Sequence, residues 1–199
     1  MQPGPQVPYG GSAPPASKFP VWIIIILVVV GLGVVGIGVF AALGIYGTRR
    51  YLAAAKTAEA KNTIGAIARG AQASYEREGA DPSAPHKLCA SATTVPAAVP
   101  AGTKYMPAAA GADFDTGDAD TGWKCLRFSM TMPMYYQYSY HQGSGYLAPS
   151  LSAGATGFEA AARGDLDGNG KTSLFAIAGR VSGGTVTVTP SIYVENEFE

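Results

Sequence analysis

The sequence predicts an α+β protein in which one long N-terminal helix, first transmembrane and then a stem, packs on a small antiparallel β-sheet head. Three observations lead to this fold class. An apolar run without a charged side chain extends from Val21 to Tyr46. Apolar side chains then continue at helical spacing to about residue 79, and the remainder alternates short strand-like runs with Gly and Pro.

The apolar run is long enough to cross a membrane, because about 20 helical residues already span the hydrocarbon core. A cleaved signal peptide is the alternative, but it predicts an apolar core of only about 7 to 15 residues. We therefore assign residues 21–47 to a transmembrane helix. Residues 1–20 are rich in Pro, Gly and Ser and are expected to form a disordered tail.

Residues 48–79 are predicted to continue the helix as an amphipathic stem. One face of this stem carries apolar side chains at helical spacing, whereas its charged side chains lie mainly off that face. The apolar positions are Leu52, Ala55, Ile64, Ile67, Ala68, Ala71 and Tyr75. Gly79, followed by Asp81-Pro82, is expected to end the helix.

Residues 80–199 are predicted to form the β-rich head. Candidate strands cover residues 123–130, 135–140, 175–181 and 185–194, and "TVTVT" shows the alternation of a half-buried strand. Glycines at 143, 145, 183 and 184 suit tight turns, which favour antiparallel pairing. A sheet of about four strands would then bury one face against the stem.

Two cysteines, Cys89 and Cys125, both follow the apolar run. An even pair without metal-ligand spacing fits a single disulfide in an oxidising compartment, and two buried free thiols are the alternative. The distribution of basic residues, in contrast to the cysteines, argues for a head on the cytoplasmic side of the membrane. Lys18 precedes the span, whereas four basic residues follow it closely, so the positive-inside rule would place the head in the cytoplasm.

The stretch "RGDLDGNGKTS" allows three interpretations. A phosphate-binding loop needs Gly at position 165, where the chain has Asp165. A calcium loop fits better, because Asp165, Asp167 and Asn169 match the first oxygen ligands of an EF-hand, although the closing acid is missing. A plain hairpin turn is the third interpretation and the one we favour, since Asp-Gly and Asn-Gly both suit such turns.

Other side chains give little indication of catalysis. His86 and His141 stand apart, with no acid or cysteine at ligand spacing, and no catalytic serine or zinc motif is present. The acidic segment "DFDTGDADTG" is expected to be a solvated loop, with calcium binding as the alternative. The tyrosines of residues 135–146 alternate along a strand, so one face would pack in the core and the other would form a contact surface.

Several pieces of the sequence together resemble type IV pilins and pseudopilins, particularly the pilin-like membrane proteins of deltaproteobacteria such as myxobacteria. These pieces are "AKTAEAKNTIGAIARGAQASYERE" in the stem, "GWKCLRFSM" and "YYQYSY" in the head, and "FEAAARGDLDGNGKTSLFAI" near the end. The resemblance implies a helix anchored in the inner membrane and an antiparallel sheet carried outside it, in the periplasm or beyond. It also implies a Cys89–Cys125 bridge between the loop after the stem and the first sheet strand.

The chain departs from that family at its beginning. Prepilins carry a basic leader, a Gly-Phe type cut and a nearby glutamate, but here no Gly-Phe precedes the apolar run and no acid lies within it. The sequence thus contains no recognisable prepilin peptidase site. An unprocessed subunit would keep its cytoplasmic tail and stay in the bilayer, so filament assembly stays open.

Two functions fit these observations. The favoured one is a pilin-like structural or interaction subunit of the inner membrane, whose partners are other pilin-like subunits or pilus and secretion machinery. The alternative is a stand-alone, membrane-tethered binding module outside the cytoplasm, for which calcium would be the ligand of the 165–169 loop. We expect no enzymatic activity, no nucleic-acid partner and no small-molecule substrate.

Overall fold

The computed structural model describes residues 20–77, 85–108, 110–149, 154 and 156–199. The chain divides into two compact units, Met1–Thr48 and Arg49–Glu199. Of the predicted tail only Pro20 is described, and the predicted stop at Gly79 and Asp81-Pro82 lies outside the described residues. The boundaries predicted between tail, span, stem and head stay predictions.

The first unit contains the beginning of helix α1, which extends from Val21 to Glu76. Its large apolar side chains are exposed, with Leu27, Ile37 and Phe40 at 66%, 72% and 77%. The most apolar part of the helix has a mean hydropathy of 3.1 and buries nothing within the protein. By length and composition, α1 contains a segment able to cross a membrane.

In the second unit, α1 buries the stripe of apolar side chains that the stem periodicity predicts. Ile64, Ile67 and Ala71 are fully buried, and Ala60, Ala68 and Tyr75 extend the same core. Burying one isoleucine side chain contributes about 1.5–3 kcal/mol. Leu52 and Ala55 differ from the prediction, since both are exposed, Leu52 over 55% of its surface. The stem therefore begins to pack on the sheet only beyond Ala55.

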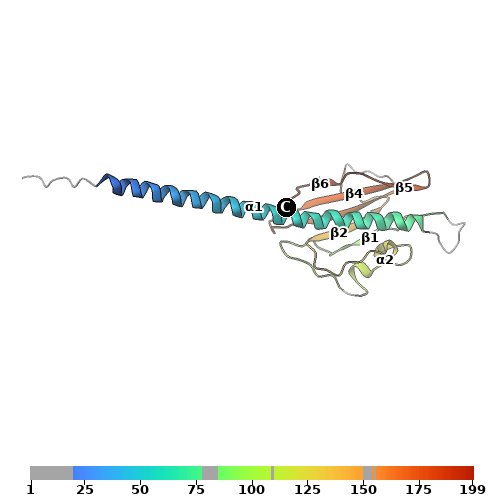
Figure 1. Ribbon diagram of the computed structural model, residues 1–199. Helices are drawn as coiled ribbons and strands as arrows, with labels where there is room; N and C mark the ends of the chain where they lie inside the picture. The colour runs from blue at the N-terminus through green and yellow to red at the C-terminus, as the bar shows by residue number, and fades with distance from the viewer. Residues whose placement is uncertain (1–19, 78–84, 109, 150–153, 155) are drawn as a thin grey trace, which may run out of the picture. The chain divides into compact units, whose positions relative to one another are not determined.

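An antiparallel sheet forms the other layer of the second unit (Figure 1). Its strands are β1 (Ala92–Val95), β2 (Tyr136–Gln142), β3 (Gly157–Gly164), β4 (Ser173–Ser182), β5 (Thr185–Val188) and β6 (Tyr193–Glu195). The order is β1-β2-β3-β4-β5, and β6 pairs with the first part of β4 while β5 pairs with its last part. The α+β fold class is thereby confirmed.

The core lies between α1 and one face of this sheet. Tyr136, Tyr138 and Tyr140 of β2 are all fully buried there, together with Phe158 and Phe175. Two glycines on neighbouring strands make room for the rings. A side chain at Gly164 would collide with the Tyr136 ring and one at Gly179 with the Phe158 ring, so the aromatic residues fill the volume that these glycines leave free.

The opposite face of the sheet carries a smaller core of Ala148, Ala161, Leu174 and Ala176. Glu159 of β3 is fully buried beside it and accepts the backbone N–H groups of Leu147 and Ala148 at 2.7 and 2.9 Å. A buried carboxylate is stable only with such partners. Glu159 therefore holds the segment after β2 against the sheet.

Two predictions for the head are wrong, and one strand was missed. The expected strand at 123–130 is absent, since residues 123–126 belong to the short helix α2 (Gly122–Leu126). Arg127, in the left-handed conformation, ends this helix after about one turn. Strand β3 was not predicted, since "FEAAARG" is rich in alanine, but burial on both faces selects the strand. The expected strand at 185–194 is divided into β5 and β6.

The disulfide between Cys89 and Cys125 is confirmed, with the Cα atoms 5.8 Å apart and a separation of 36 positions in sequence. Its expected attachment to a first sheet strand is wrong, because Cys125 lies in α2. The bridge joins the segment before β1 to α2, and the carbonyl of Cys89 accepts the Tyr140 hydroxyl at 3.1 Å. It thus ties α2 to the edge of the sheet.

Candidate functional site

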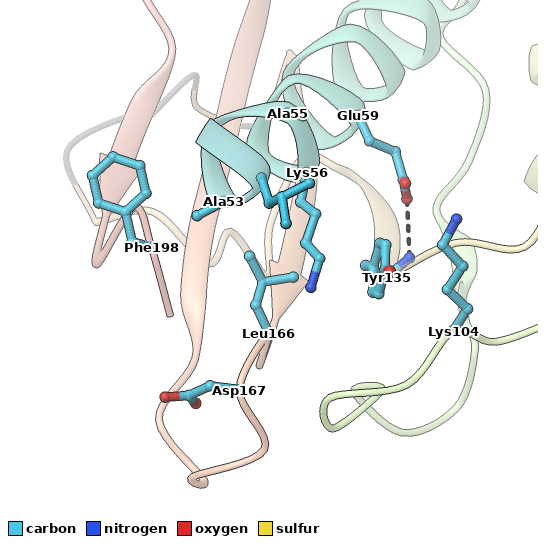
Figure 2. A pocket seen from close by; sticks show the side chains of 10 residues that line it. Ala53, Ala55, Lys56, Glu59, Lys104, Tyr135, Leu166, Asp167 and Phe198 are labelled. Carbon is cyan, nitrogen blue, oxygen red and sulfur yellow. Dashed lines mark hydrogen bonds between the residues drawn. The ribbon is translucent and has the colours of Figure 1, made fainter. Parts of the chain in front are cut away.

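A groove of about 650 Å³ opens in the second unit, between the first turns of the stem, the start of β2 and the turn after β3 (Figure 2). This volume is in the range of small-molecule binding sites. One part of its lining is apolar, and charged side chains form the rest. The lining residues are Leu52, Ala53, Ala55, Lys56, Glu59, Lys104, Tyr135, Leu166, Asp167 and Phe198.

Glu59 connects the stem to the sheet at this groove. Its Oε1 atom accepts the backbone N–H of Tyr135 at 3.0 Å and the hydroxyl of Tyr138 at 3.4 Å. Burial is the main cause that raises the pKa of Tyr138 above its ordinary value, and the negative charge of Glu59 adds to it. Tyr138 consequently stays protonated and keeps donating to Glu59.

Tyr135 lies at the centre of the groove and binds two ammonium groups through its ring. The Nζ atom of Lys56 is 4.3 Å from the ring centroid and that of Lys104 is 4.7 Å from it. Figure 2 shows Tyr135 between the two lysines, one from the stem and one from the loop that follows β1. Each contact is a cation–π interaction of roughly 0.5–1 kcal/mol in an exposed setting.

The next residue, Tyr136, is buried and its hydroxyl has no hydrogen-bond partner among the described residues. Burial raises its pKa above the ordinary value, and the carboxylates of Glu59 and Glu197 raise it further. The alternation predicted for the tyrosines is therefore correct in part. Tyr136, Tyr138 and Tyr140 form the core face, while Tyr135 and Tyr146 are half-buried.

A second group of polar side chains occupies the turn after β3, where Asp165, Asp167 and Asn169 stand close together. Asp165 is almost completely buried and accepts the backbone N–H groups of Gly168, Asn169 and Gly170 at 2.7, 3.1 and 3.0 Å. The Asn169 side chain donates to Asp167 and to Glu199. These bonds are those of a turn built on aspartate.

The calcium interpretation of these three residues stays a prediction. Glu199 is the acid that sequence reasoning missed, because only the folded chain brings residues 169 and 199 together. Within the described residues, no group of three or more His, Cys, Asp or Glu side chains gathers in a way that would hold a metal ion.

The acidic segment of residues 113–120 is ordered by its own carboxylates. Asp113 accepts the Tyr105 hydroxyl and the Ala108 N–H at 2.9 and 2.7 Å. The Asp118 carboxylate accepts the backbone N–H groups of Asp120 and Thr121. These bonds, chiefly the one from Asp120, lower the pKa of Asp118. The oxygens are directed at separate donors and do not converge on one point.

The two histidines also lie apart from the groove. The His86 Nδ1 atom is 2.7 Å from the carbonyl oxygen of Tyr75, at the end of the stem. His141 lies on β2, opposite Glu159 in the register with β3. Neither lines the groove, and the expectation that this chain is not an enzyme stays a prediction.

Comparisons of this chain with protein-family models, with curated proteins and with solved structures find no match. The architecture alone is consistent with a pilin-like protein, since a long helix with an exposed apolar segment also packs on an antiparallel sheet. The groove beside Tyr135 was not predicted from the sequence. Lys56 and Glu59 are one helical turn apart, which is the only local signal for it.

Proposed function

We propose that this protein is a pilin-like structural subunit, anchored in the inner membrane by residues 21–47 and presenting its sheet-containing unit in the periplasm or outside the cell. Its partners are other pilin-like helices or the machinery of type IV pili or type II secretion. The single observation that carries this proposal is the division of α1. Its first segment exposes apolar side chains, and its later segment is buried on a sheet.

The exposed apolar segment needs a cover that the described residues do not provide. Most leucine, isoleucine and phenylalanine side chains in this segment expose more than half of their surface, and so do Val21, Trp22 and Val35, whereas Ile23 is half-buried. Only lipid or other apolar helices remove such a surface from water. A membrane anchor that also contacts like helices satisfies this requirement.

The disulfide supports the placement of the second unit outside the cytoplasm. Disulfides persist in oxidising compartments and are rare in the reducing cytosol. The basic residues after the span favour the opposite orientation, but a covalent bond between Cys89 and Cys125 is the more direct indicator of compartment. The proposed topology is a single span with the N-terminus in the cytoplasm.

The proposal is tested by single cysteines placed one at a time along residues 31–47 of the full chain in its native membrane. The native cysteines are paired and do not interfere. We expect disulfide-linked dimers at positions that repeat every three to four residues, because helices that pack together meet on one face. A cysteine at the exposed Thr187 of β5 is the control and should not give this pattern.

The alternative function, a stand-alone tethered binding module, predicts a different result. The ordered 165–170 turn is the observation that favours it, because three oxygen-bearing side chains stand close together there. In that case no position between 31 and 47 would crosslink, and calcium would raise the unfolding midpoint of the protein. This outcome would overturn the pilin-like proposal.

A further inference from the structure

The groove beside Tyr135 contains two ammonium groups that form no ion pair with a carboxylate of the described residues. The ion pairs of the described residues are Lys61–Glu197, Lys87–Asp120 and Lys124–Asp115. Lys56 and Lys104 take part in none of these ion pairs, and the ammonium group of each lies over the Tyr135 ring. Since both distances are measured to one centroid, the two nitrogens are at most about 9 Å apart.

The two carboxylates of the groove are directed elsewhere. Glu59 accepts the backbone N–H of Tyr135 and the Tyr138 hydroxyl. Asp167 accepts the backbone and side-chain N–H groups of Asn169 at 3.1 and 2.8 Å, and in Figure 2 its carboxylate points away from both lysines. The lining carries two positive and two negative charges, so its net charge is zero. Because both carboxylates are occupied by hydrogen-bond donors, the charge left to bind a ligand is positive.

Two neighbouring ammonium groups repel each other across this distance, because it is close to the screening length of about 8 Å at physiological salt. An anion placed at the mouth of the groove would interact favourably with both. A phosphodiester suits this position, since a lysine binds phosphate as a mobile point charge with three donors.

The rest of the lining is apolar and open to its surroundings. Leu52 and Phe198 expose 55% and 49% of their surface, and Ala53, Ala55 and Leu166 also line the groove. These apolar side chains can contact a hydrocarbon chain attached to the anion. The ligand with these two parts is an amphiphile that carries a phosphate group.

The position of the groove in the sequence points to the same class of ligand. Leu52 follows Tyr46, the last residue of the apolar run, by only six residues. When residues 21–46 cross a bilayer, the helix rises about 1.5 Å per residue, so Leu52 stands about 9 Å beyond Tyr46. This distance is close to the outer edge of the headgroup layer, which is about 5 to 8 Å thick on each side. Exposed Arg50 and Tyr51 are the residue types that anchor a helix at this layer.

We propose that this groove binds an anionic phospholipid, with the phosphodiester at the mouth of the groove within reach of both Lys56 and Lys104, and the first acyl carbons against Leu52 and Phe198. The inference rests on the membrane anchoring within the proposed function and is independent of assembly with other pilin-like helices. Tyr135 orients both lysines, and Glu59 fixes the position of Tyr135.

The experiment uses the full chain in dodecyl maltoside micelles, titrated with dioctanoyl phosphatidylglycerol, with lipid adducts counted by native mass spectrometry. We expect the wild-type protein to bind this lipid at least tenfold more tightly than dioctanoyl phosphatidylcholine. Lys56→Gln and Lys104→Gln should each weaken binding roughly three- to tenfold, and the double variant should bind the two lipids equally. Lys56→Arg should retain the preference, which separates loss of charge from loss of fold.

Lys171→Gln is the matched control, since it removes one exposed ammonium group outside the groove and should leave the preference unchanged. Equal binding of the two lipids by the wild-type protein would overturn the proposal. So would displacement of phosphatidylglycerol by the same concentration of inorganic phosphate, because the site would then hold a free anion. Failure of the lipid titration leaves the crosslinking result intact, whereas release of the chain from membranes by alkaline carbonate would refute the anchoring itself.

Discussion

Glu59 on α1 and Tyr135, the residue directly before β2, are joined by a hydrogen bond of 3.0 Å between the carboxylate Oε1 atom and the backbone N–H. The two residues are 76 positions apart in the chain. The bond is one of the polar links between the stem and the sheet, and it also sets the position of the ring that both groove lysines contact.

Replacement of Glu59 by alanine should lower the free energy of unfolding by about 1–3 kcal/mol, because two donors lose their charged acceptor. Chemical denaturation of the full chain in detergent measures this change. Glu76→Ala is the control on the exposed side of α1, where a surface substitution should change stability by less than about 0.5 kcal/mol. Equal effects of the two variants would show that the bond does not stabilise the fold.

Two glycines of the stem should respond in opposite directions to alanine. A Cβ atom on Gly70 would stand 2.6 Å from the carbonyl oxygen of Leu126, so Gly70→Ala should destabilise the protein by about 1–3 kcal/mol. A Cβ atom on Gly65 would meet only the end of the Arg69 side chain, at 3.5 Å. Gly65→Ala should therefore stabilise by up to about 1 kcal/mol through helix propensity. Thermal unfolding of both variants checks the sign.

Removal of the disulfide by the paired substitution Cys89→Ser and Cys125→Ser should cost about 3–4 kcal/mol, as expected for a loop closed by cysteines 36 positions apart. Denaturation of the wild-type protein with and without reductant provides an independent measurement. If reduction left the unfolding midpoint unchanged, the bridge would not stabilise this unit.

The turn after β3 should depend on Asp165 far more than on Asp167. Asp165→Ala leaves the N–H groups of Gly168 and Gly170 without their acceptor and the Asn169 N–H with Asp167 alone, and it should cost about 2–3 kcal/mol. Asp167 is exposed, and Asp167→Ala should cost less than about 1 kcal/mol. Urea denaturation of both variants separates them. A larger loss in the Asp167 variant would contradict the hydrogen-bond pattern of this turn.

The buried tyrosines should make the protein sensitive to alkali. Burial raises the pKa of Tyr136 and Tyr138 above the ordinary value of 10.0, so each keeps its proton longer in the folded chain than in the unfolded one. Their contribution to stability is complete below pH 10.0 and is lost as the pH rises from there through the folded pKa. Unfolding midpoints between pH 8 and about 12, with tyrosinate absorbance, should follow this loss.

Tyr136→Phe is the variant that isolates this effect. Because the Tyr136 hydroxyl has no partner among the described residues, the substitution should change stability little at neutral pH. It should make the decline above pH 10.0 shallower. An unchanged alkaline profile would show that Tyr136 does not contribute to the loss of stability.

Local patterns in the sequence were sufficient for some elements. The uncharged run after Pro20 predicted a helix suited to a membrane, and the spacing of Ile64, Ile67 and Ala71 predicted the buried stripe of the stem. The "TVTV" alternation predicted β5, and glycines marked its turn. These features depend on neighbours within a few residues, where helical or strand periodicity acts directly.

Tertiary structure decided what depends on distant parts of the chain. The alanine-rich segment of β3 is a strand because β2 and β4 pair with it on both sides. Residues 123–126 form one helical turn within reach of Cys89, rather than a strand. The groove arises only when Lys56 and Glu59 meet Lys104 and Tyr135. Contacts between such distant residues leave no periodic signal, because packing and charge select them only in the folded protein.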